Sequence, residues 1–198
     1  MRQKIRFFKW TPQDKVNAVF ALGMGFKRDF TDISDQTKSI CSTAALIALQ
    51  NNSPLLLVGQ EMDNEQNEST ETDVKSYWVP NESSKMYRFV RYLHAEKKLI
   101  DNLTQLDAPT LYGKLDQVLE LIEKKEWKKV AIVCHADLIL RVKKILKQLG
   151  LMKNIECSIY FAPIRPAYNG DCDFWWTREG WRSKIYETAC RVLNLINR

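Results

Sequence analysis

The stretch that decides the fold is KKVAIVCHADLILRVKKILK, residues 128–147. Its apolar run at 130–134 predicts a short buried strand, and His135 follows directly, ahead of a helix that carries Arg141. A polar residue between a buried strand and a helix lies at the carboxyl end of that strand, and open α/β sheets bind their ligands in the crevice beyond such ends. His135 is therefore the first candidate for the functional site.

Two further strands are predicted to end in glycine. The first apolar run, NAVFAL, is followed by Gly23 and Gly25, and the second, LLLVG, ends at Gly59. A helix predicted at 39–49 separates them, so the segment predicts a right-handed parallel crossover that brings the glycines to one edge of the sheet. Because glycine lets backbone amides approach a ligand closely, this edge is predicted to bind one.

The rest of the chain alternates in the same way. Further elements are predicted as helices at 85–98, 111–125, 137–149 and 178–197 and as a strand at 155–162. Strands that alternate with helices favour an α/β fold with an open, mostly parallel sheet and helices on both faces. We expect a single domain over 1–198, with a polar, acidic loop at about 60–84 and a long surface loop or lid at about 163–178.

Composition limits the classes of function. Hydrophobic residues make up 45% of the chain, with only 7 Gly and 6 Pro, which is typical of an ordered globular protein. The net charge of +6 fits either an anionic ligand or solvated lysine-rich helix faces, and scattered lysines without interleaved aromatic residues argue against nucleic acid as a partner. Five cysteines without a CxxC pair indicate reduced thiols, and no segment resembles a signal peptide or a membrane span. We expect a cytoplasmic protein that does not bind a membrane.

Candidate chemistry centres on His135. The chain has only 2 histidines, and a zinc site needs three or four protein donors, so no metal is expected. Cys134 precedes His135 within the strand and should point to the opposite face, which makes a Cys–His nucleophile pair geometrically awkward. His135 is then a general acid or base, a hydrogen-bond donor to a phosphate or carboxylate, or a structural cap. Arg141 either binds the same anion bidentately or extends to solvent.

Other polar residues carry further interpretations. Thr110 stands where a helix begins, so it either caps the exposed amides or, with that helix terminus, binds an anionic oxygen. His94 falls on a predicted helix and is interpreted as structural. Glu187 and Arg191 lie one turn apart in the last predicted helix, where such a pair stabilises a helix by a few tenths of a kcal/mol.

Five short motifs, taken in order, resemble the YdcF/SanA/ElyC-like family, a bacterial domain of largely unassigned function. They are LGMG at 22–25, LLLVG at 55–59, DAPTLYG at 107–113, VAIVCHADLILR at 130–141 and YETACR at 186–191. The resemblance implies a Rossmann-like fold with a crevice for a nucleotide-like or S-adenosylmethionine-like ligand. The positions it implies for ligand binding are Gly23, Gly25, Gly59, Thr110, His135 and Arg141, with Glu187 from the last motif. The chain departs from the family pattern after Gly59, where Gln60 replaces a second glycine.

A second resemblance concerns 118–146, which looks like the second-histidine segment of histidine phosphatases. That family also requires an early Arg-His-Gly motif, which the sequence lacks, so this alternative is disfavoured. The main hypothesis is a protein that binds a nucleotide-like or S-adenosylmethionine-like anionic ligand at the strand ends, as a transferase or hydrolase. In it, His135 and Arg141 orient or protonate the ligand. The competing hypothesis is a non-catalytic partner-binding protein that keeps the fold.

Overall fold

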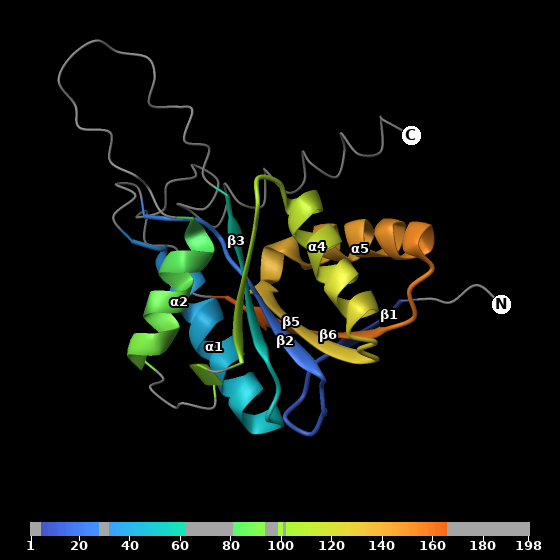
Figure 1. Cartoon of the computed structure of the whole chain (residues 1–198), viewed down its shortest axis with the longest axis horizontal. Helices are drawn as coiled ribbons and strands as arrows, with labels where there is room; N and C mark the ends of the chain where they lie inside the picture. Colours follow the sequence, from blue (N-terminus) through green and yellow to red (C-terminus); the bar gives the residue numbers. More distant parts are fainter. Residues whose placement is uncertain (1–4, 28–31, 62–80, 94–98, 101, 166–198) are drawn as a thin grey trace, which may run out of the picture.

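The computed structural model describes residues 5–27, 32–61, 81–93, 99–100 and 102–165 (Figure 1). Most of the predicted acidic loop, His94, most of the predicted lid, and the last predicted helix with Glu187 lie outside these residues. The expectations for those segments stay predictions. No helix within the described ranges is long and apolar enough to cross a membrane.

The described strands form one open sheet in which every neighbouring pair is parallel. The six strands are β1 (Arg6–Lys9), β2 (Ala18–Leu22), β3 (Leu55–Gln60), β4 (Leu103–Ala108), β5 (Lys129–His135) and β6 (Ser158–Ile164). Their order across the sheet is β1-β6-β5-β2-β3-β4. The predicted Rossmann-like open sheet is therefore confirmed.

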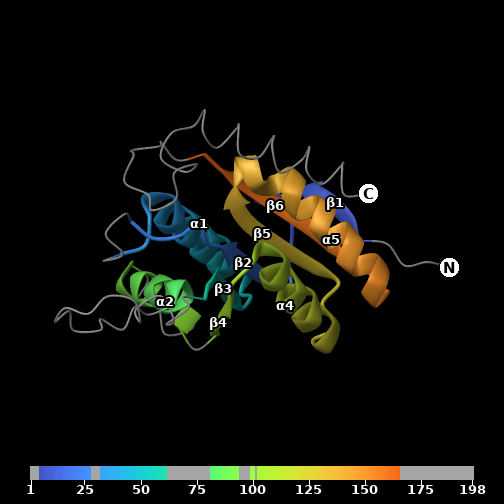
Figure 2. The ribbon, with the colours of Figure 1, turned by 90° about the horizontal axis from the view of Figure 1, so that it is seen from above.

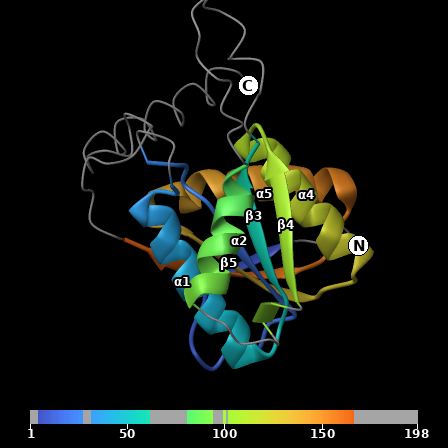
Figure 3. The same ribbon diagram turned by 60° about the vertical axis from the view of Figure 1, so that its left-hand side comes forward.

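Helices cover both faces of this sheet, as the sequence predicted. On one face lie α1 (Asp35–Asn51) and α2 (Glu82–Leu93), and on the other lie α4 (Leu111–Lys124) and α5 (Ile139–Lys153) (Figure 2). Figure 3 shows α1 and α2 next to each other, on the side of the sheet away from α4. Each face encloses its own apolar cluster, and alternate residues of the central strands contribute to the two clusters in turn.

The sequence did not predict β1, because its segment RFFK contains no apolar run. The strand forms by pairing with β6 at the edge of the sheet, where Phe8 stands opposite Tyr160. The two rings stack with their centroids 5.2 Å apart. Pairing and aromatic contact with a distant segment therefore define β1, and neither is visible in the local pattern.

Three helices begin at other residues than predicted, and one of them is α2, which begins at Glu82 and not at 85. The first, α1, begins at Asp35 and not at 39, because Ser34 caps it by accepting the Thr37 N–H at 3.2 Å. In its first turn Gln36 and Thr37 are polar yet buried, so the apolar periodicity starts late. Before α5, a short 3₁₀ turn, η2 (Ala136–Leu138), takes up the residues at which the sequence placed the helix start.

Candidate functional site

The two central strands, β2 and β5, meet at a topological switch point. From β2 the chain continues through α1 to β3 on one side, and from β5 it continues through α5 to β6 on the other side. Because α1 and α5 lie on opposite faces, the two connections diverge beyond the strand ends (Figure 2). Open α/β sheets form their ligand crevices at such points. Gly23 follows β2 and His135 ends β5, so both residues stand at the switch point.

Four residues form one row across this edge of the sheet. Continuing the parallel ladders of β2 places Gly23 beside His135 on one side and beside Gly59 on the other. The ladder between β3 and β4 itself pairs Gly59 with Asp107. The row faces α1 and α2, because the alternate residues that precede His135 in β5 belong to the apolar cluster under those helices. The edge predicted from glycines and His135 therefore does bring them together.

Cys134 lies on the opposite face from His135. It is fully buried and belongs to the apolar cluster under α4 and α5. Burial raises the pKa of the Cys134 thiol to about 12, although the Lys143 cation acts in the other direction. A thiol with so high a pKa stays protonated and unreactive at neutral pH, so no Cys–His pair forms here.

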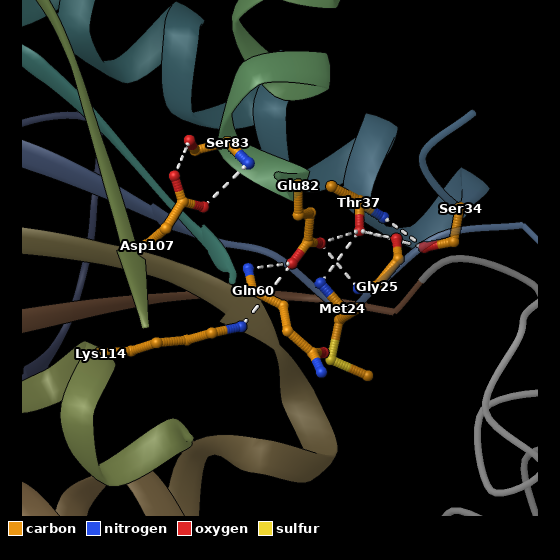
Figure 4. A network of polar contacts seen from close by, with 9 residues as sticks. All are labelled: Met24, Gly25, Ser34, Thr37, Gln60, Glu82, Ser83, Asp107 and Lys114. Atoms are coloured by element: carbon orange, nitrogen blue, oxygen red, sulfur yellow. Dashed lines mark hydrogen bonds and ion pairs between the residues drawn. The ribbon is translucent and has the colours of Figure 1, made fainter. Parts of the chain in front are cut away.

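The glycine end of the row is filled by a carboxylate of the chain itself (Figure 4). Glu82 is the first residue of α2 and is fully buried. Its Oε1 accepts the Gly25 N–H at 2.7 Å and lies 3.1 Å from the Thr37 hydroxyl, which also lies 3.0 Å from the Gly25 carbonyl oxygen. Its Oε2 accepts the Gln60 N–H at 2.8 Å and lies 3.6 Å from the Lys114 ammonium. These partners offset the cost of removing a carboxylate from water.

The glycines leave the space that Glu82 and its helix occupy. A Cβ atom at Gly23 would lie 2.2 Å from Glu82 Oε1, and one at Gly59 would lie 2.3 Å from the Ser83 backbone nitrogen. Gly25 has a φ of 96°, a conformation that other residues rarely adopt. Gly23 and Gly59 therefore admit protein groups and Gly25 allows a left-handed backbone turn, and the role of the three glycines toward an external ligand stays a prediction.

The start of α2 is anchored from β4. Asp107 Oδ1 accepts the Ser83 N–H at 3.2 Å, and the Ser83 hydroxyl donates to the other oxygen of the same carboxylate. The hydroxyl of Ser84 donates to Gln105 Oε1 at 3.1 Å. Carboxylates are stabilising at the positive end of a helix, and here Glu82 and Asp107 already occupy that position.

His135, at the other end of the row, is 1% exposed. Its Nδ1 accepts the Asp137 N–H at 3.3 Å and so caps η2. Burial lowers the pKa of His135; the Asp137 carboxylate opposes this shift and the Arg165 cation adds to it. Asp137 Oδ2 lies 3.8 Å from Nδ1, which is an ion pair only if the ring is charged. The lowered pKa and the accepted N–H both indicate a neutral ring with its proton on Nε2.

Thr110 and Arg141 lie outside the row. Thr110 is the N-cap of α4, and its hydroxyl accepts the Gly113 N–H at 3.1 Å, in agreement with the capping interpretation. Arg141 lies in the first turn of α5 and is half-buried. Contacts of either residue with a ligand stay predictions.

Sequence reasoning missed both Glu82 and Lys114. Glu82 fell within the polar, acidic loop predicted at about 60–84, to which no site residue was assigned. Lys114 carried a detectable signal, because it lies three residues after Leu111 and four before Val118, on the apolar stripe of α4. Lysine is almost never buried without a partner, and Lys114 is only 7% exposed.

A scan of the chain against protein-family models finds no match, and a search of curated proteins finds none either. Within the described ranges no three His, Cys, Asp or Glu side chains are grouped so that they could hold a metal ion. The functional interpretation therefore depends on the geometry of the carboxyl edge.

Proposed function

We propose that this protein binds a small anionic ligand, nucleotide-like or S-adenosylmethionine-like, at the switch point between β2 and β5. The observation that carries the proposal is the place of His135, a buried imidazole at the end of β5 and beside Gly23 in the row. A polar side chain at such a point is positioned to contact a molecule that enters the crevice.

Two cations on the His135 side support an anionic ligand. Arg165 follows β6 and is exposed, and its charge contributes to the lowered pKa of His135. Arg141 lies in the first turn of α5, just beyond η2. A guanidinium group binds phosphate or carboxylate bidentately. In the proposal these cations hold the ligand while His135 orients or protonates it, in a reaction of the transferase or hydrolase class.

The proposal includes membership of the YdcF/SanA/ElyC-like family and a cytoplasmic location. The order of the five motifs along the chain supports the family. Among the described residues, Cys41, Cys134 and Cys157 are free and buried, which is the state expected in a reducing compartment. The proposed partner is the small ligand, with no part for nucleic acid or a membrane.

A thermal-shift panel tests the proposal. A ligand that binds only the folded protein raises its melting temperature by mass action, so orthophosphate, adenosine monophosphate and S-adenosylmethionine are added in turn. His135→Asn should abolish the rise, whereas the same substitution at the other histidine, His94→Asn, should leave it unchanged. Asparagine at position 135 keeps an acceptor for the Asp137 N–H, so the cap survives. Gly25 is unsuitable for this test, because its φ of 96° makes any side chain destabilising.

The same panel distinguishes the competing function. A non-catalytic partner-binding protein would show no rise with any of the three compounds. That result, or an equal rise in wild type and His135→Asn, would contradict the proposed ligand site.

A further inference from the structure

The two ends of the row differ in charge. At the end formed by β3 and β4, the carboxylates of Glu82 and Asp107 hold the start of α2, and one ammonium, that of Lys114, lies 3.6 Å from Glu82 (Figure 4). At the end formed by β5 and β6, the charges of the Arg165 guanidinium and the Asp137 carboxylate act on His135, and Arg141 follows in the first turn of α5. An anionic group of a ligand is therefore less favoured at the β3 end than at the β5 end.

Glu82 also takes the donors that an anion would use at the glycine end. In ligand-binding sheets of this type, the backbone amides beyond the glycine-ended strands bind phosphate. Here the amides of Gly25 and Gln60 donate to the Glu82 carboxylate at 2.7 and 2.8 Å. A phosphate beside Glu82 would face a like charge and would have to displace the carboxylate from these two amides.

The ring of His135 is oriented as a donor at the other end. Because Nδ1 accepts the Asp137 N–H at 3.3 Å, the proton of the neutral ring lies on Nε2. A neutral imidazole in this tautomer donates a hydrogen bond through Nε2 and cannot accept a proton there, so it serves as a hydrogen-bond donor and not as a general base.

We infer that the ligand carries a single anionic group, a phosphate monoester or a carboxylate, which accepts a hydrogen bond from His135 Nε2–H at the β5 end, while Glu82 keeps anions out of the β2–β3 end. This inference rests on the proposed function and sharpens it. A diphosphate that bridges both ends of the row does not fit, because its second phosphate would meet Glu82.

Nitrogen NMR of the histidine rings tests the tautomer before any ligand is added. With only 2 histidines in the chain, the His94→Asn variant leaves the signals of His135 alone. Long-range ¹H–¹⁵N correlation at pH 7.5 should show Nε2 protonated and Nδ1 unprotonated. Adenosine monophosphate should then shift the Nε2 signal of His135 and leave the backbone amides of Gly25 and Gln60 almost unmoved.

The outcomes separate the inference from the proposed function. A proton on Nδ1 in the ligand-free protein overturns the inference, whatever the thermal-shift panel shows. Binding of adenosine monophosphate that shifts the amides of Gly25 and Gln60 but not His135 also overturns the inference, while it supports ligand binding at the strand ends. If the tautomer is as expected but no compound of the panel binds, the proposed function fails and this inference fails with it.

Discussion

The two ends of the row from Asp107 to His135 differ in what lies beyond the strand ends. At the glycine end, the space beyond the strands is filled by Glu82, which two backbone amides, a hydroxyl and an ammonium surround. At the β5 end, His135 caps a short turn through Nδ1 and keeps its proton on Nε2. At one end a buried carboxylate is fully hydrogen-bonded by groups of the protein and stabilises the fold, whereas at the other a ring donor lies within reach of the charge of Arg165.

This difference shows that a glycine-ended strand is not by itself an anion site. The same lack of a side chain that admits a phosphate also admits a glutamate from a neighbouring helix, and only the structure tells the two cases apart. Here Gly23 and Gly59 leave room for the start of α2, and the proposal of a ligand depends on His135. Substitutions at either end of the row, and a change of pH, test this difference.

Removal of Glu82 should have the largest effect. Glu82→Ala leaves the ammonium of Lys114 buried without its carboxylate and two amides without an acceptor, so we expect a loss of about 3–5 kcal/mol in the free energy of unfolding. Urea denaturation measures it. The matched control is Glu120→Ala, which removes a largely exposed partner of Lys153 and should cost about 0–1 kcal/mol.

A double-mutant cycle refines this result. Combining Glu82→Ala with Lys114→Met removes both buried charges, so the double variant should be more stable than the sum of the two single losses implies. Strict additivity would mean that the 3.6 Å contact between Glu82 and Lys114 carries no coupling and that Lys114 does not compensate the buried carboxylate.

A methyl group at Gly59 should have the next largest effect. Its Cβ would lie 2.3 Å from the Ser83 backbone nitrogen and would push α2 away from β3, so Gly59→Ala should cost about 1–3 kcal/mol. Gly113→Ala is the matched control, because a Cβ there lies 3.2 Å from its nearest neighbour and alanine favours the helix. Equal losses in the two variants would show that α2 is not held against Gly59.

Acid should have the smallest effect, through His135. Burial and the Arg165 cation lower the pKa of His135 in the folded protein, and the Asp137 carboxylate opposes this shift. Below a pH of about 6.5, the ordinary pKa of histidine, the unfolded chain therefore binds the proton more readily than the folded protein does. The contribution of His135 to stability is present above that pKa and is lost as the pH falls. The stability of wild type relative to His135→Asn should thus decrease between pH 7.5 and 5.5. An unchanged or growing difference toward low pH would mean that His135 is charged in the folded state.

The fold was largely predictable from the sequence because its central strands are buried on both faces. Runs such as AVFAL and LLLVG need no partner to be recognised, and the spacing between them implies parallel crossovers. In contrast, β1 depends on its pairing with β6, and the start of α1 depends on a cap and a buried polar turn. Non-local contacts define these features, so local periodicity cannot show them.

The candidate site was predictable only in part. Gly23, Gly59 and His135 follow apolar runs, so their common edge could be inferred from the order of elements alone. Glu82 could not be found in this way, because it comes from a segment without a strand and reaches the row only through the packing of α2. Lys114 could have been predicted, since a lysine on the apolar stripe of a helix indicates a buried partner.

We expect the anionic group of the ligand to lie at the His135 end of the row and not at the glycine end. The most direct measurement is a crystal structure with adenosine monophosphate. We expect the phosphate within about 3.2 Å of His135 Nε2, with the Glu82 carboxylate still bound to the amides of Gly25 and Gln60. A phosphate held by those two amides, with Glu82 displaced, would contradict the account.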